Sequence, residues 1–378
     1  MNNSTDSMVK EQFDAIVLDP ASSEPLYVQL EKAIMDRIQV CQWMPGFRLP
    51  TYRKLAEMTG VSLITVQQAV NNLVNRNLLY RRQGQGTFVA TQETKSASNR
   101  IALFLPNLRE PFFSVLAQII QTEMINDGYA VSIFAMDDGV SQIARAVELM
   151  RDHDVDGIIT TTASNEETFS QVLRARSWNI PVIIVDGHIP GEEISYVECD
   201  NHEGMTLIID HLVSHGHRRI GFASGPCYTY GLKARMEAFS EIMSKRGIGF
   251  NPSCLQISHL DRDEGGWDAA HKLLLLRDPP TAIACSTDMV AAGVLRAARA
   301  LGIKVPDQLS VVGFDDLYLA AHLEVPLTTI RQPVEKIGKI AKKMILERIR
   351  KTSKSVMEFH TLPPKLVMRS STGPVCEP

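Results

Sequence analysis

The feature that most constrains this chain is a regular alternation through residues 100–378, where short apolar runs are followed by amphipathic helical runs. This alternation is typical of parallel sheets that carry helices on their faces. We expect two sets of strands, at 101–105, 129–135, 156–160 and 182–185, and at 220–224, 282–286 and 310–314. Helices are expected at 112–126, 142–150, 166–176, 203–214, 232–245, 267–276 and 289–300. The pattern predicts an α/β domain of two doubly wound parallel lobes, with a ligand cleft outside the carboxyl ends of the strands.

Residues 23–90 follow a different pattern. Apolar residues at helical spacing end before Pro45 and Gly46, and Thr51 and Ser62 can each cap a further helix. The third helix carries a stripe for burial, made of Val66, Ala69, Val70 and Leu73. Two strand-like runs, at 80–82 and 87–89, flank glycines that permit a tight hairpin. Three helices followed by a hairpin predict a winged helix-turn-helix.

The chain is therefore expected to have four parts: a polar leader at 1–22, a winged helix-turn-helix at 23–90, a linker at 91–99, and an effector-binding and dimerisation domain at 100–378. The linker shows no apolar periodicity. The first residues lack the apolar segment of a signal peptide, and no apolar run approaches the roughly 18 residues that a membrane span needs. We expect a cytoplasmic protein with no membrane partner.

Charge is unevenly distributed along the chain. Between Arg48 and Lys95 there are seven basic and two acidic residues, a local charge of +5. Since the whole chain carries −4, the remainder carries −9. A basic winged helix is suited to DNA, whereas the acidic remainder would be repelled by phosphates.

The helix that follows Ser62 would be the recognition helix, with its first turns offered to the major groove. Gln67 and Gln68 can bond to adenine, and basic residues before this helix and in the hairpin can neutralise phosphates. On periodicity and charge alone, the alternative of an ordinary solvated helix beside a hairpin stays open. The expected DNA-binding residues are Arg53, Lys54, Ser62, Leu63, Thr65, Gln67, Gln68, Arg81, Arg82, Gln83, Gly84 and Gly86.

Longer motifs add to this interpretation. The segments Pro45-Gly-Phe-Arg-Leu-Pro-Thr and Gly84-Gln-Gly-Thr-Phe-Val89, with those that begin at Pro25 and Gly60, resemble the winged helix of the GntR family over its whole length. The resemblance implies binding to operator DNA. Leu63 stands where that family usually has Arg, and Cys41 stands where it usually has Gly, so the operator sequence is left undetermined.

Several carboxylates follow expected strand ends, namely Asp186, Asp288 and Asp315. Carboxylates accept paired hydrogen bonds from vicinal hydroxyls, and an arginine such as Arg235 can donate two, which together would hold a polyol. Aromatic side chains, with Phe112, Phe113 and Trp267 as candidates, could cover the C–H surface of a sugar. The alternatives are that each Asp caps a helix and that the phenylalanines belong to the core.

This second segment resembles the effector domain of the LacI/GalR family, itself similar to periplasmic sugar-binding proteins. Matching stretches include Pro181-Val-Ile-Ile-Val-Asp186, Val311-Val-Gly-Phe-Asp-Asp316 and Pro326-Leu-Thr-Thr-Ile-Arg-Gln-Pro333. The resemblance implies that Arg235 and Asp315 hold the effector from opposite sides. Asp261 and the pair Thr287-Asp288 depart from the family pattern. The implied effector-binding residues are Phe112, Phe113, Asp186, Arg235, Asp261, Thr287, Asp288 and Asp315.

No metal site or cofactor is predicted. The six cysteines are scattered without zinc-site spacing, and they are expected to be reduced thiols. His211, His215 and His217 are close in sequence, but the matching family stretch is a structural turn from helix to strand.

The sequence thus predicts a homodimeric transcription regulator, expected to be a repressor, whose partners are double-stranded operator DNA and a small-molecule effector of the sugar class. The fusion of the two segments resembles bacterial arabinose repressors of the AraR type. The alternatives are a purine or other metabolite as effector, or a different class of protein: a fused enzyme or a solute-binding protein. An enzyme would need a nucleophile or cofactor lysine, and no such arrangement stands out.

Overall fold

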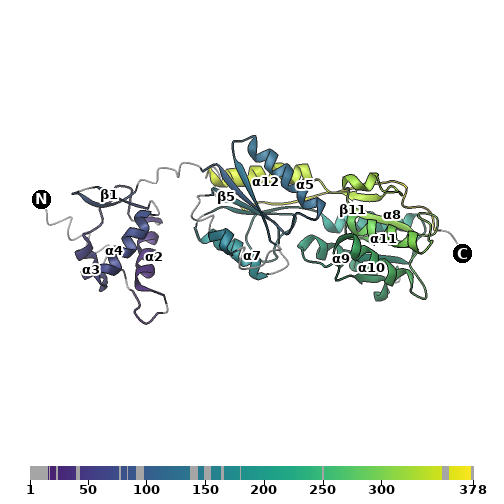
Figure 1. Ribbon diagram of the computed structural model, residues 1–378, viewed down its shortest axis with the longest axis horizontal. Helices are drawn as coiled ribbons and strands as arrows, with labels where there is room; N and C mark the ends of the chain where they lie inside the picture. Colours follow the sequence, from purple (N-terminus) through teal and green to yellow (C-terminus); the bar gives the residue numbers. More distant parts are fainter. Residues whose placement is uncertain are drawn as a thin grey trace. The chain divides into compact units, whose positions relative to one another are not determined.

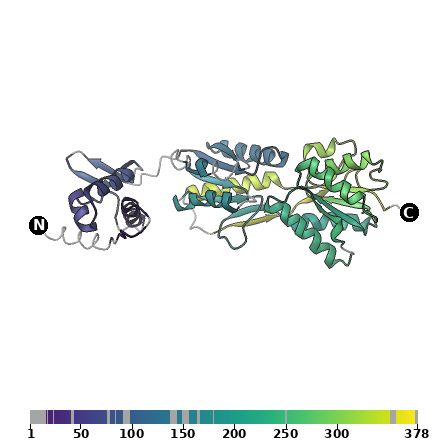
Figure 2. The same ribbon diagram turned by 60° about the horizontal axis from the view of Figure 1, so that its bottom comes forward.

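The computed structural model describes Ile16 and residues 18–22, 24–39, 43–75, 78–82, 84–90, 98–136, 144–148, 155–162, 166–178, 180–248, 251–350 and 357–375. The chain divides into two compact units, Met1–Ala97 and Ser98–Pro378. Figure 1 and Figure 2 show the small helical first unit and the α/β second unit. Among the described helices, none is long and apolar enough to cross a bilayer. The finer domain limits remain a prediction.

The first unit is the predicted winged helix. Its helices are α2 (Leu26–Gln39), α3 (Tyr52–Thr59) and α4 (Leu63–Asn75), and its antiparallel hairpin joins β1 (Leu79–Arg82) to β2 (Gly86–Val89). Thr51 caps α3 by accepting a hydrogen bond from the backbone N of Lys54 at 3.3 Å. The expected stripe of α4 is fully buried, together with Leu30, Ile34 and Leu55 of the other helices.

The hairpin is braced by the segment before α3. The backbone N of Leu49 donates to the carbonyl of Thr87 at 2.9 Å, and that of Val89 donates to the carbonyl of Phe47 at 2.8 Å. Gly84 and Gly86 have φ of 72° and 120°, in the left-handed region that glycine adopts without steric cost. The glycines are therefore required by the turn, as the sequence predicts.

The first lobe of the second unit is built on a six-stranded parallel sheet in the order β13-β7-β6-β5-β3-β4. Helices α5 (Pro111–Ile125) and α12 (Val334–Ile349) cover one face, and α7 (Glu166–Leu173) covers the other (Figure 1). The strands are β3 (Arg100–Leu105), β4 (Ala130–Ala135), β5 (Gly157–Thr160), β6 (Val182–Val185), β7 (Tyr196–Cys199) and β13 (Phe359–Leu362). The predicted helix at 142–150 is described only at 144–148, where the chain is helical.

The second lobe repeats this design with the order β14-β12-β11-β10-β8-β9, in which β14 runs antiparallel to β12 and the other pairs are parallel. Helices α8 (Asn201–Ser214) and α9 (Tyr230–Lys245) cover one face, and α10 (Arg262–Leu274) and α11 (Asp288–Ala300) cover the other. The strands are β8 (Ile220–Ser224), β9 (Leu255–Ile257), β10 (Ala282–Cys285), β11 (Ser310–Asp315), β12 (Thr328–Arg331) and β14 (Lys365–Val367).

The sequence pattern suggested that each lobe is one contiguous stretch of chain, but this is wrong. The chain passes from the first lobe to the second after β7, returns after β12 to form α12 and β13, and passes again to form β14. Within each sheet, the strand order changes direction between the first and third strands, at β3/β5 and at β8/β10. Such switch points open a crevice at the carboxyl ends of the strands, and this fixes where a ligand site can form.

His211 in the last turn of α8, with His215 and His217 just after the helix, holds a C-terminal segment against the second lobe. The Nε2 atom of His211 lies 2.9 Å from Oγ1 of Thr372, and His217 contacts Thr281, Ser310 and the carbonyl of Gly373 at 2.9–3.1 Å. Burial, with the neighbouring His215 and His217, lowers the pKa of His211 to about 4. Within the described ranges, no group of three or more potential ligands is arranged to hold a metal ion.

We expect the second unit to lose stability as the pH falls from about 6.5 toward 4. The folded-state pKa of His211 lies below its unfolded value, so the neutral form is favoured in the fold, and the free energy of unfolding decreases once the unfolded chain binds the proton. The loss would be at most about 3 kcal/mol from this residue. Denaturant unfolding at pH 7 and pH 5 should show a smaller change in the free energy of unfolding for His211→Gln than for the wild type. The exposed His259 provides a matched control; an equal effect in His259→Gln would contradict this account.

Candidate effector cleft and DNA-binding surface

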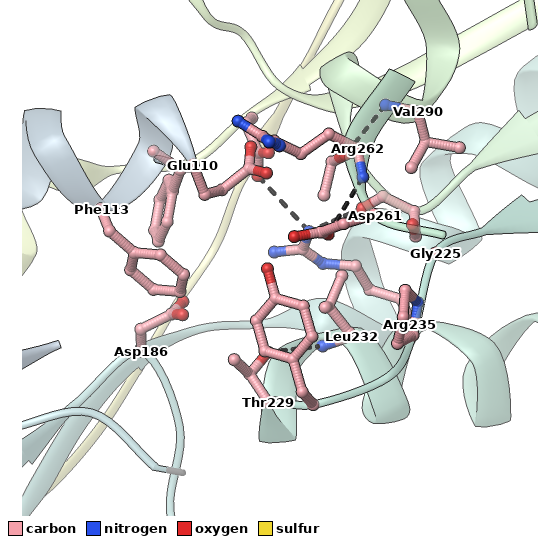
Figure 3. A pocket seen from close by; sticks show the side chains of 16 residues that line it. Glu110, Phe113, Asp186, Gly225, Thr229, Leu232, Arg235, Asp261, Arg262 and Val290 are labelled. Carbon is pink, nitrogen blue, oxygen red and sulfur yellow. Dashed lines mark hydrogen bonds and ion pairs between the residues drawn. The ribbon is translucent and has the colours of Figure 1, made fainter. Parts of the chain in front are cut away.

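The carboxyl ends of the strands of both lobes border one pocket of about 460 Å³, including its open mouth (Figure 3). The loops after β3, β6, β8, β9, β10 and β11 all contribute, which is the position that the two switch points predict. The lining residues are Glu110, Phe112, Phe113, Asp186, Gly225, Pro226, Tyr228, Thr229, Leu232, Arg235, Asp261, Arg262, Ser286, Thr287, Val290 and Asp315.

Arg235, on α9, lies at the centre of the pocket floor and is buried. Its Nε donates to Oδ1 of Asn201 at 2.8 Å, and its Nη1 donates to the carbonyl of Ser286 at 2.7 Å. Nη1 also lies 3.4 Å from Oδ1 of Asp315, and the guanidinium stacks 3.7 Å from the ring centroid of Phe314. Arg235 and Asp315 thus lie side by side in the pocket lining, and the contacts with an effector that are expected of them stay a prediction.

Two of the carboxylates occupy strained backbone positions. Asp186 has φ of 58° and Asp315 has φ of 119°, each directly at the end of its strand. Such conformations cost roughly 1–3 kcal/mol in a residue other than glycine and cluster at functional sites. Here they turn both side chains toward the space between the lobes.

Three carboxyl groups in the pocket each have an oxygen with no hydrogen-bond partner among the described residues. These are Glu110, Asp186 and Asp315, whose side chains are at most 6 % exposed. Burial raises the pKa of Glu110 to about 8 with help from Asp315 and Asp261, and burial raises the pKa of Asp186 to about 7. Burial also raises the pKa of Asp315 to about 6, although Arg235 opposes the shift. Unpaired buried polar groups are costly, so this arrangement favours a ligand that supplies the missing partners.

Most of the residues implied by the family resemblance line this pocket. Phe112 and Phe113 pack edge to face at 5.3 Å in the first turn of α5. Asp261 and Thr287 also line it, but each caps a helix by accepting a hydrogen bond, from the backbone N of Arg262 and of Val290 respectively. Asp186, Arg235 and Asp315 complete the set that the fold brings together.

Asp288 is not among the lining residues. Its carboxylate accepts hydrogen bonds from the backbone N of Leu317 at 2.7 Å and from Oγ1 of Thr329 at 2.5 Å, inside the second lobe. It joins β11 and β12 instead of facing the cleft. Trp267 is also absent from the pocket lining; its ring packs against Arg296 at 5.0 Å.

The sequence analysis did not predict five polar residues that line the pocket, namely Glu110, Tyr228, Thr229, Arg262 and Ser286. Glu110 precedes the proline that begins α5, in the loop after β3. Asp186 directly follows β6, whereas β3 ends at Leu105, five residues before Glu110, so the strand-end criterion would not have found Glu110. Nothing in the sequence alone marks Tyr228 or Arg262.

Hydrogen bonds join the lobes around this pocket. The Tyr230 hydroxyl lies 3.1 Å from Nε2 of His188, and the backbone N of Tyr230 donates to Oγ1 of Thr162 at 3.2 Å. A longer contact of 3.5 Å joins Nη1 of Arg262 to the carbonyl of Arg109. The lobes are therefore in a closed arrangement.

On the first unit, the start of α4 presents a mixed polar and apolar surface. Gln67 and Gln68 are exposed, and Leu63 is 40 % exposed. Ser62 caps α4 by accepting a hydrogen bond from the backbone N of Thr65 at 3.1 Å, and its hydroxyl lies 2.7 Å from that of Thr65. Exposed Arg53 and Lys54 lie on α3, where Lys54 is 3.4 Å from Glu57.

The wing carries further basic groups. Arg81 donates to the Tyr52 hydroxyl at 2.8 Å and also contacts Asn71, while Arg82 lies over the rings of Tyr80 and Phe88. Gly84 and Gly86 are exposed, and Gln83 lies outside the described residues. The exposed Arg48, which was not among the expected contacts, lies beside Gly86.

Each of the two units matches a known protein family. Residues 26–89 match the model for bacterial regulatory proteins of the gntR family, and residues 209–372 match that for a periplasmic binding protein-like domain. The chain is 32 % identical to the HTH-type transcriptional regulator MalR of Streptomyces coelicolor, over 84 % of this chain and 95 % of that protein.

Solved structures share the fold. A LacI family regulator from Enterococcus faecium with bound ribose has a TM-score of 0.64 and 24 % identity, over 73 % of this chain and 100 % of that one. The regulator CelR in complex with cellobiose has a TM-score of 0.67 and 21 % identity, over 85 % of this chain and 99 % of that one. The chain therefore belongs to the HTH-type transcriptional regulators, with a DNA-binding winged helix that matches the gntR family and a second unit that matches a periplasmic binding protein-like domain.

Proposed function

We propose that this protein is a homodimeric cytoplasmic repressor whose effector is a polyol of the sugar class, bound in the interlobe pocket. The observation that carries the proposal is the convergence of unpaired buried oxygens from both lobes, those of Glu110, Asp186 and Asp315, on one cavity. Hydroxyl groups are the natural partners of these oxygens, because each can donate to a carboxylate.

Phe112 and Phe113 add an apolar surface on the first-lobe side of the same pocket. A sugar ring has hydroxyls at its edge and C–H groups on its faces, so it matches a site of this mixed kind. The ribose and cellobiose named for two regulators of the same fold support this choice of chemical class. For this site we propose binding and no catalysis.

Operator recognition is assigned to the first turns of α4 and to the wing. Gln67, Gln68 and Leu63 are exposed there and can reach base edges, whereas Ser62 and Thr65 are occupied with each other. Arg53, Lys54 and Arg82, together with Arg48 and the wing glycines, would contact the backbone of the DNA. Because one small winged helix buries too little surface for high specificity, we propose that two copies bind a palindromic operator.

Gln68→Ala should reduce discrimination at one base pair by roughly 1–3 kcal/mol, whereas Arg82→Ala should weaken binding to all sequences and lower the salt slope by about one. Binding curves on operator and random DNA at several salt concentrations measure both effects. Lys272→Ala, a basic residue of the second unit, is the control for loss of charge. Equal loss on specific and random DNA for Gln68→Ala would remove this residue from base readout.

Asp186→Asn and Asp315→Asn should each weaken binding of the sugar by about tenfold to a hundredfold, because a hydroxyl loses a charged acceptor, worth roughly 1.5–3 kcal/mol. Operator affinity without ligand should be unchanged. Calorimetric titration of the sugars found by thermal shift, beside operator binding, tests both statements. Glu324→Gln, an exposed carboxylate of the second lobe, is the control. Sugar affinity within about threefold of wild type in both variants would remove the pocket from the proposal.

A further inference from the structure

The polar groups of the pocket are strongly unbalanced in charge. Four carboxyl groups line it, those of Glu110, Asp186, Asp261 and Asp315, against the two guanidinium groups of Arg235 and Arg262. The first lobe contributes only acids to this set, Glu110 and Asp186. With a neutral polyol bound, the repulsion among these acids is relieved only by protons on them, and burial raises the pKa of Glu110 to about 8 and that of Asp186 to about 7.

The two arginines offset the charge of the first-lobe acids only in part, because burial still raises the pKa of both Glu110 and Asp186. Arg235 already donates to Asn201, to the carbonyl of Ser286 and to Asp315. Arg262 reaches across the cleft with Nη1 to the backbone of Arg109. Among the described residues, the buried pocket atoms that lack a partner are three carboxyl oxygens and a single donor, Nε of Arg262. The unpaired buried groups of the pocket are therefore mostly acceptors, and a ligand that carries hydrogen-bond donors would match them.

Glu110 is a first-lobe acid whose carboxyl faces the charged groups of the second lobe. It lies at the start of α5 in the first lobe, is 6 % exposed, and its backbone N is held at 2.8 Å by Oδ1 of Asn107. The charged groups that face its carboxyl are Asp315 and Asp261, which oppose ionisation, and Arg262 and Arg235, which favour it. All four belong to the second lobe, so closing the cleft brings acids from opposite lobes together. Tyr228, whose hydroxyl stays neutral, is also close.

Two arrangements relieve this repulsion: a proton on Glu110, or a cation between the lobes. Burial and the two aspartates raise the pKa of Glu110 to about 8, so the proton is bound when the cleft is empty at neutral pH. A cationic group placed beside Glu110 would replace that proton, and it would be attracted by both lobes at once.

We propose that the effector is a polyol that carries an ammonium group, and that this group binds between Oε1 of Glu110 and Oδ2 of Asp315. The inference rests on the proposed function of the pocket as a polyol site. Oδ1 of Asp186 then accepts a hydroxyl of the same molecule. Phosphorylated sugars and sugar acids are excluded, because a second set of negative charges would be buried against these carboxylates.

Matched ligands test the ammonium directly. Glucose, galactose and mannose, their 2-amino and 6-amino derivatives, and the N-acetyl forms of those amines are titrated calorimetrically into the full chain at pH 7. The N-acetyl forms keep most of the shape of the amine and remove its charge. At least one amine should bind about tenfold more tightly than its neutral parent and its N-acetyl form. In Glu110→Gln this preference should fall to about threefold or less, while Glu324→Gln should retain it.

Proton release supplies a second measurement that needs no variant. Binding of an ammonium should displace the proton of Glu110, so the measured heat should depend on the ionisation enthalpy of the buffer. Affinity for the amine should rise between pH 6 and pH 8, because less protonated Glu110 has to be ionised as the pH approaches its pKa of about 8.

The outcomes separate this inference from the proposed function. If neutral hexoses bind as tightly as their amines and release no proton, the ammonium is wrong and the polyol pocket stands. If no member of the set binds, both proposals fail. If amines are preferred with proton release, but equally in Glu110→Gln, the cation is placed elsewhere and the assignment to Glu110 is overturned.

Discussion

The buried guanidinium of Arg235 joins four separate segments of the second lobe. It extends from α9 to Asn201 at the start of α8, to the carbonyl of Ser286 after β10, and to Asp315 at the end of β11. Removing a charged group from water costs several kcal/mol unless hydrogen bonds and an opposite charge replace the solvent. Here both are present, and the ring of Phe314 supports the remaining face. The position of Asp315, and with it the unpaired oxygen that the cavity receives, depends on this contact.

The two lobes are coupled because they share chain as well as contacts. Three connections cross between them, and the C-terminal elements α12, β13 and β14 are divided between both sheets. Two-lobed domains of this kind close by rotation about short connecting segments. The hydrogen bonds of Tyr230 with His188 and Thr162 join the second lobe to the first. A ligand that contacts both lobes therefore acts on the same equilibrium as these protein contacts, and its affinity and the DNA affinity of the regulator are linked reciprocally.

Local patterns in the sequence predicted those features that depend on residues close together in the chain. The caps at Thr51 and Ser62, the buried stripe of α4 and the glycine hairpin each depend on residues a few positions apart, and each was predicted. The alternation of strands and helices also identified the α/β class. Strands β7, β9, β12, β13 and β14 were not predicted, because strands this short are defined by the partners they pair with rather than by their own apolar pattern.

The pocket was predicted less completely, for a related reason. A strand-end carboxylate can be identified in sequence, but its direction is set by the backbone. Asp186 and Asp315 turn into the cleft with positive φ, whereas Asp288 lies within α11 and bonds inside its own lobe. Glu110 acquires its importance from acids on the opposite lobe, and no pattern within one segment carries that information.

The division of the last strands also has a consequence for synthesis on the ribosome. The first-lobe sheet ends in β13 and the second-lobe sheet ends in β14, and only two residues separate these strands in the chain. Neither lobe can complete its sheet while the chain is being extended through residue 358, although most of their strands already exist. Both would then be completed almost together. In a nascent chain, every residue that lines the pocket, from Glu110 to Asp315, is thus made before the two sheets receive their last edge strands.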